Sequence, residues 1–104
     1  MAEKSTWEVK IEDEAARIFE SSHLTDEDKT VIQNWAILVR DKGPEALHNR
    51  PGVWADHPLY AEWAGHRASS FSHSGRIIYR IDEEAKRVIV AKITHDHNYK
   101  GVKR

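Results

Sequence analysis

The sequence predicts an α+β fold with the order β-α-α-β-β-β, in which two N-terminal helices pack on one face of a small, twisted, mostly antiparallel sheet. Two observations support this prediction. Apolar residues recur at helical spacing through residues 13–42, and they alternate or run together in strand-length segments over residues 66–94. The length of 104 residues suits a single domain over residues 1–104, with a basic tail at about residues 100–104.

The N-terminal part predicts one strand followed by two helices. Residues 7–11 alternate apolar and polar side chains, which is typical of a strand with one buried face. Apolar residues at helical spacing then predict a helix over about residues 13–20. Thr25 and the three acidic residues after it indicate the start of a second helix, because they cap its first turn and suit its dipole. Gly43-Pro44 ends that helix.

The C-terminal part predicts a long loop and three strands. Residues 44–65 follow no regular pattern, and a loop of this length in a compact domain is often functional. The strands are expected at residues 66–73, 76–81 and 87–94. Because the last strand is almost continuously apolar, we expect it at the centre of the sheet and covered on both faces.

Composition excludes several classes of protein. The chain has no cysteine, which rules out disulfides, cysteine-bound zinc and thiol catalysis. It has no apolar run long enough to span a membrane, and its polar N-terminus does not resemble a secretory signal, so we expect a cytoplasmic protein.

The charge is divided unevenly along the chain. Residues 1–65 hold 7 Lys/Arg and 13 Asp/Glu, whereas residues 66–104 hold 9 Lys/Arg and 4 Asp/Glu. This asymmetry indicates either a surface that binds a polyanion or simply acidic helices beside basic strands.

The seven histidines are candidate metal ligands. His95-Asp96-His97 is a short ligand-like cluster, but no HExxH or similar spacing occurs, and no further ligand set is evident. We therefore expect no metal site and no cofactor. His23 and His48 are expected to be exposed and solvated.

Clustered histidine and arginine also suit metal-free cleavage of RNA. The 2′-hydroxyl is the nucleophile, so an enzyme needs a base, an acid and cations that stabilise the phosphorane. Histidine serves in either proton transfer, and the planar guanidinium of arginine holds two phosphate oxygens. The second half of the chain contains these groups.

Three segments resemble bacterial type II toxins of the RelE/YoeB/YafQ superfamily, an mRNA interferase family. They are Asp56-His57-Pro58-Leu59, Glu62-Trp63-Ala64-Gly65-His66-Arg67 and Gly75-Arg76-Ile77-Ile78-Tyr79-Arg80-Ile81. The apolar strand 88–94 followed by His95, His97 and Tyr99 fits the ending typical of the family. The order of elements matches the family fold over nearly the whole chain.

The resemblance implies a role for each matching residue. His57 matches the position of the family's general base, and Arg76 matches the arginine that stabilises the phosphorane. His95 or His97 would be the general acid, with Tyr99 stacking on a base or steadying the acid.

Four further basic residues are expected to bind RNA. They are Arg67, Arg80, Lys92 and Lys100. For Arg67 the alternative is an ion pair with an acid such as Glu62, while Trp63 and Tyr79 are expected to be packing residues.

The resemblance also implies partners: a cognate antitoxin, and mRNA at the 30S A site of the ribosome, with a homodimer or a toxin–antitoxin hetero-oligomer as the assembly. Family members that act on the ribosome tend to be basic, whereas this chain has a net charge of −1. The alternatives are a ParE-like toxin that inhibits DNA gyrase without nuclease activity, or a non-enzymatic RNA- or protein-binding module.

Overall fold

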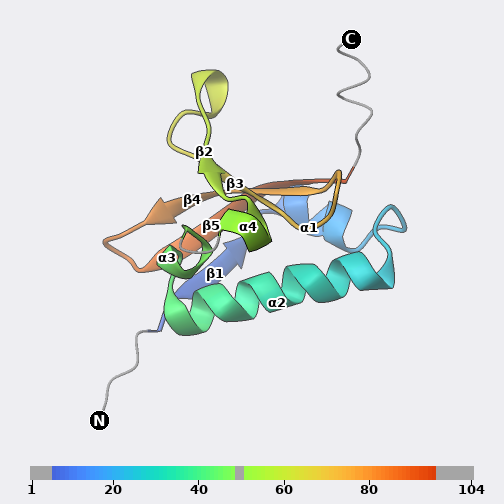
Figure 1. Cartoon of the computed structure of the whole chain (residues 1–104), viewed down its shortest axis with the longest axis horizontal. Coiled ribbons are helices and arrows are strands. Elements are labelled where there is room, and N and C mark those ends of the chain that lie inside the picture. Colours follow the sequence, from blue (N-terminus) through green and yellow to red (C-terminus); the bar gives the residue numbers. More distant parts are fainter. Residues whose placement is uncertain (1–5, 49–50, 96–104) are drawn as a thin grey trace.

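The computed structural model describes residues 6–48 and 51–95 of the chain. Its elements follow one another as shown in Figure 1. They are β1 (Glu8–Ile11), α1 (Asp13–Phe19), α2 (Asp26–Lys42), α3 (Glu45–His48), α4 (Pro51–Trp54), β2 (His57–Pro58), the 3-10 helix η1 (Ala61–Trp63), β3 (Arg67–Ser70), β4 (Arg76–Asp82) and β5 (Arg87–Thr94).

The strands form one mixed sheet in the order β1-β5-β4-β3-β2. β1 runs parallel to β5, and the other three pairings are antiparallel. The predicted α+β class and the order of helices before strands are therefore confirmed. The sheet has one more strand than expected, because His57-Pro58 pairs with the start of β3 as a two-residue edge strand.

Helix α2 covers one face of the sheet (Figure 1). It begins where the sequence predicts, since the Thr25 side chain accepts from the Asp28 amide and the Asp28 carboxylate accepts from the Thr25 amide. Trp35 and Val39 are fully buried on the side of α2 that packs against the sheet. Gly43 ends the helix with φ +86°, a conformation that costs glycine little.

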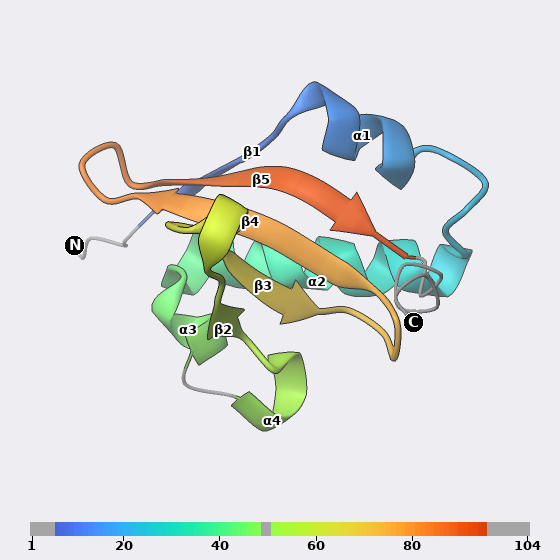
Figure 2. The same ribbon diagram turned by 90° about the horizontal axis from the view of Figure 1, so that it is seen from above.

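Helix α1 follows β1 and lies beside β5 (Figure 2). The Glu12 amide donates to the Val90 carbonyl, which attaches the start of α1 to β5. Ala15 is fully buried and belongs to the same core as α2, together with Ile77 and Val88 of the sheet.

Three expectations about the second half need correction. The predicted loop 44–65 contains α3, α4, β2 and η1, and the strand expected at 66–73 spans only Arg67–Ser70. It ends there because Phe71 turns into the core over Gly75, where any Cβ would lie 2.3 Å from the phenyl ring.

The third correction concerns β5. It is an interior strand, between β1 and β4, whereas the centre of the sheet is β4; within the described residues no α-helix covers the face of β5 opposite α2 (Figure 1). Ile89 on that face is nevertheless buried, with Lys10 and Arg80 as its register neighbours on the flanking strands. The long side chains of such neighbours shield apolar surface from water. Among the described residues, this face of the sheet therefore has no α-helix over it, and we call it the open face.

Among the residues that the structure describes, no helix has the length and apolarity needed to cross a membrane.

Candidate functional site

The open face of the sheet carries a small groove that joins residues from four strands. The groove has a volume of about 210 Å³ and is lined by both His57 and Arg76. The rest of its lining comprises Leu59, Trp63, Ala68, Ile78 and Thr94. Strand register explains this grouping, because His57 pairs with Ala68 and Ala68 with Ile78, and paired residues present their side chains to the same face.

A β-bulge adds basic side chains to the same face. The pairing of β4 with β5 shifts between Ile78 and Tyr79, which leaves Ala91 outside the ladder. The extra residue turns Lys92 onto the face of Ile78, its register partner. Arg80 lies on this face too, two residues after Ile78. The structure therefore places Arg76, Arg80 and Lys92 on the same face of the sheet as His57.

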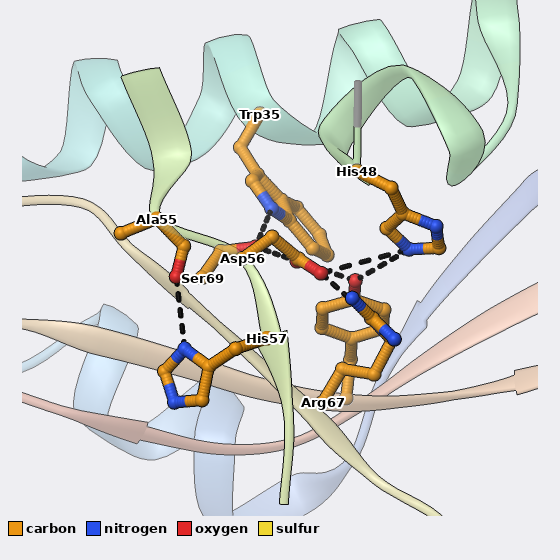
Figure 3. Close-up of polar contacts among 8 residues, drawn as sticks. Trp35, His48, Ala55, Asp56, His57, Arg67 and Ser69 are labelled. Carbon is orange, nitrogen blue, oxygen red and sulfur yellow. Dashed lines mark hydrogen bonds and ion pairs between the residues drawn. The ribbon is translucent and has the colours of Figure 1, made fainter. Parts of the chain in front are cut away.

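His57 is exposed, and the backbone carbonyl of the residue two positions before it orients its ring. Its Nδ1 lies 2.9 Å from the carbonyl oxygen of Ala55, so Nδ1 carries the proton and donates (Figure 3). A neutral imidazole then has Nε2 as its acceptor. Ala55 has φ +49°, a left-handed conformation that is unusual for alanine and that turns the chain from α4 into β2.

Arg76 is half-buried and ends the β3–β4 turn. Its Nη1 donates to the Gly75 carbonyl at 2.9 Å and lies within 3.4 Å of the carbonyls of Ser72 and His73. Within residues 6–48 and 51–95, Nε and Nη2 have no hydrogen-bond partner. The guanidinium is thus held at one nitrogen and retains donors for an anion.

On the opposite face of the sheet, a buried carboxylate accepts three hydrogen bonds (Figure 3). The Asp56 side chain is 0% exposed and accepts from Arg67 Nε at 2.6 Å, Ser69 Oγ at 2.6 Å and Tyr79 Oη at 2.5 Å. Ser69 in turn accepts from Trp35 Nε1 of α2 at 3.0 Å. This cluster could not be predicted from the sequence, because nothing in the local pattern shows that these residues meet.

Burial and the Asp56 carboxylate shift the pKa values of two neighbours. Burial, reinforced by the hydrogen bond to Asp56, raises the pKa of the Tyr79 hydroxyl. Burial by itself lowers the pKa of Arg67, but the hydrogen bond and charge of Asp56 outweigh it and raise that pKa. Arg67 and Tyr79 therefore stay protonated as donors to Asp56.

The expectation that His48 is solvated is wrong, although His23 is exposed as expected. The His48 side chain is only 28% exposed, with Nε2 3.3 Å from the Tyr79 hydroxyl and 3.6 Å from Asp56. Burial, followed by the charge of Arg67, lowers the pKa of His48 against the opposing effect of Asp56.

Arg67 and Arg80 lie in different surroundings. Arg67 points away from the groove, toward Asp56, so its acidic partner is Asp56 rather than Glu62. Arg80 lies on the groove face, 3.7 Å from a Glu12 carboxylate oxygen, in an exposed pair of the kind that contributes little to stability.

The two aromatic residues expected to pack have different positions. Tyr79 is fully buried, which confirms the expectation. Trp63 is only partly buried and lines the groove instead.

Of the two candidate general acids, only His95 lies within the described residues, and it does not line the groove. His95 stacks on His23 of the α1–α2 loop, with ring centroids 5.0 Å apart and 13° between the planes. His97, Tyr99 and Lys100 lie outside the described residues.

Within the same part of the chain, no three His, Asp or Glu side chains gather in a way suited to a metal ion.

Comparison with known sequences identifies no relative of this chain. No family model matches it, and no curated protein matches its sequence.

Comparison with solved structures does find similar proteins. The toxin–antitoxin complex RelBE2 from Mycobacterium tuberculosis matches with a TM-score of 0.63 and 22% identity, over 88% of this chain and 100% of that chain. The YoeB dimer from Staphylococcus aureus matches with a TM-score of 0.66 and 15% identity, over 88% and 99%. YafQ from E. coli matches with a TM-score of 0.66 and 16% identity, over 89% and 97%. The chain therefore has the fold of the RelE, YoeB and YafQ toxins, as its sequence resemblance predicts.

Proposed function

We propose that this protein is the toxin of a type II toxin–antitoxin system and acts as a metal-free endoribonuclease on mRNA at the ribosomal A site. One observation carries the proposal: His57 and Arg76, which the sequence resemblance assigns to catalysis, line a single groove on the open face of a RelE-like fold. A proton acceptor and a guanidinium in one groove are what cleavage by the RNA 2′-hydroxyl requires.

His57 acts as the general base in this proposal. Its Nδ1–H is held by the Ala55 carbonyl, so Nε2 is the nitrogen that takes the proton of the 2′-hydroxyl. The 2′-oxygen then attacks the adjacent phosphorus.

Arg76 stabilises the phosphorane that this attack forms. Its position at the start of β4 is secured through Nη1, and Nε and Nη2 donate to two non-bridging phosphate oxygens. Because the guanidinium is already held before RNA binds, little reorganisation accompanies the reaction.

The general acid comes from the C-terminal segment. It protonates the departing 5′-oxygen, the last step that cleavage needs. The His95 ring is stacked on His23, so we assign this role to His97, with Tyr99 beside it on the RNA.

Three basic residues contact the RNA backbone. Arg80 and Lys92 lie on the same face as the groove and bind phosphates that flank the cleavage site. Lys100 extends this contact in the proposal. Arg67 is left out, because its guanidinium is bound to a buried carboxylate on the other face.

The cognate partner is an antitoxin. Several of the solved structures with this fold are complexes of a toxin with its antitoxin, among them RelBE2 from M. tuberculosis, YoeB–YefM from S. aureus and RelE–RelB from Pyrococcus horikoshii. We expect an antitoxin to neutralise this chain in the same way, as part of a hetero-oligomer.

The proposal is tested by expressing the wild type, His57→Ala and Arg76→Ala separately and mapping transcript ends by primer extension. Arg17→Ala, an exposed arginine on α1, is the matched control and should cut like the wild type. We expect the two groove variants to lose cleavage at least about 100-fold. Growth arrest by the wild type without cut transcripts would instead favour a gyrase-directed toxin or a binding module.

A further inference from the structure

We propose that Asp56 is a positioning residue that sets the place and the tautomer of His57 relative to Arg76. The inference rests on the proposed function and extends it to a residue that does not touch the RNA.

The geometry around Asp56 ties β2 to both of its neighbours in the sheet. Arg67 and Ser69 belong to β3 and Tyr79 to β4, and all three donate to the same carboxylate at 2.5–2.6 Å. Hydrogen bonds to an ionised acceptor are about twice as strong as neutral ones. The 0% exposure of the Asp56 side chain keeps water from competing for them.

The ladder that holds β2 to the sheet is short. It consists of two residue pairs with β3, and one of these contains Pro58, which has no N–H to donate. The residues that follow β2, 59–66, project from the sheet as a narrow excursion (Figure 1). In the described part of the chain, the Asp56 hydrogen bonds therefore give β2 a second attachment to the sheet, beside its short ladder with β3.

The attachment acts directly on His57. Consecutive residues in extended chain point to opposite faces, so Asp56 buried on the α2 side places His57 in the groove (Figure 3). The bond to Tyr79 connects the base to β4, the strand that begins with Arg76. This hydrogen bond therefore couples the position of the base to the strand that carries the cation.

Asp56 also holds the group that selects the tautomer. Ala55, the residue before it, keeps φ +49°, and its carbonyl accepts from His57 Nδ1. When Asp56 is released, this segment is free to leave the left-handed conformation, and the Nδ1 proton loses its acceptor. Free imidazole then distributes its proton between both nitrogens.

The test compares Asp56→Asn with Val39→Ala, a buried α2 residue outside the site. An asparagine keeps one acceptor oxygen but replaces the other with an NH2 group, which cannot accept from Ser69 or Tyr79. We expect Asp56→Asn to lower the single-turnover cleavage rate by about 10- to 100-fold with RNA affinity changed less than about threefold. By ¹⁵N NMR, its His57 should change from the Nδ1–H form to a mixture. Val39→Ala should lose only thermal stability.

If Asp56→Asn does not fold, Tyr79→Phe gives the same test, because it removes one donor and keeps the packed ring. It should shift the His57 tautomer and the rate in the same direction by a smaller factor. The inference is overturned if the folded variant keeps the Nδ1–H form and the wild-type rate. A wild type that cuts no RNA, together with a tautomer change in the variant, would contradict the proposed nuclease and leave the positioning role supported.

Discussion

The hydroxyl of Tyr79 on β4 donates a 2.5 Å hydrogen bond to the buried carboxylate of Asp56, which precedes β2. It also lies 3.3 Å from Nε2 of His48. The hydroxyl therefore accepts from His48 while it donates to Asp56, and it links α3 and β2 to the centre of the sheet.

Replacing Tyr79 with Phe removes this hydroxyl from two partners, the buried Asp56 and the half-buried His48. We expect the free energy of unfolding to fall by about 1–3 kcal/mol, because an incompletely satisfied buried polar group bears its full desolvation cost. Urea denaturation measures the change. Tyr60→Phe is the matched control, since Tyr60 is 74% exposed and should change the free energy by less than about 0.5 kcal/mol. Equal stability of the two variants would contradict the importance of the hydroxyl.

The pKa of His48 makes stability depend on pH. Burial and Arg67 lower this pKa below its ordinary value of 6.5, so the unfolded chain binds the proton more readily than the folded protein does. The contribution of His48 to stability is therefore complete above pH 6.5 and is lost as the pH falls below it.

Unfolding of the wild type and of His48→Gln between pH 7.5 and 5.5 checks this sign. The stability difference between the two should shrink as the pH falls, because glutamine does not titrate. A difference that stays constant over this range would show that His48 has the same pKa in both states.

Gly43 and Gly65 both have positive φ values, +86° and +88°, but their surroundings differ. A Cβ at Gly43 would lie 2.9 Å from Trp7 Nε1, whereas a Cβ at Gly65 meets nothing within 4 Å. We expect Gly65→Ala to cost about 1 kcal/mol from the backbone alone and Gly43→Ala to cost more, through displacement of the indole. Thermal denaturation of both variants measures the difference; a larger loss at Gly65 would refute this account.

Lys92 should contribute to RNA binding through charge alone. The measurement uses a His57→Ala background, which prevents cleavage in our proposal. In this background, Lys92→Ala should make the fall of log affinity with log salt concentration less steep by about 0.7 for a single-stranded RNA. Lys42→Ala, an exposed lysine at the end of α2 on the other side of the sheet, should leave the slope unchanged. Equal slopes for all three proteins would remove Lys92 from the RNA surface.

The sequence by itself determined the parts of this protein that depend on neighbouring residues. Thr25 and Gly43 set the ends of α2 through local capping and a positive φ, and strand periodicity located β4 and β5. The resemblance to toxin families indicated His57 and Arg76 as candidate site residues, and both line one groove. These features are recognisable because each rests on contacts within a few residues of the chain.

Only the tertiary structure decided which residues meet. The donors to Asp56 come from 11, 13 and 23 positions away, so their convergence depends on strand register that no local pattern encodes. For the same reason Arg67 proved to be bound to Asp56, and His48 proved to be half-buried. The bulge at Ala91 likewise reversed the face of Lys92. A shift of one residue in pairing reverses every side chain beyond it, so the two faces of this sheet were fixed by packing rather than by sequence spacing.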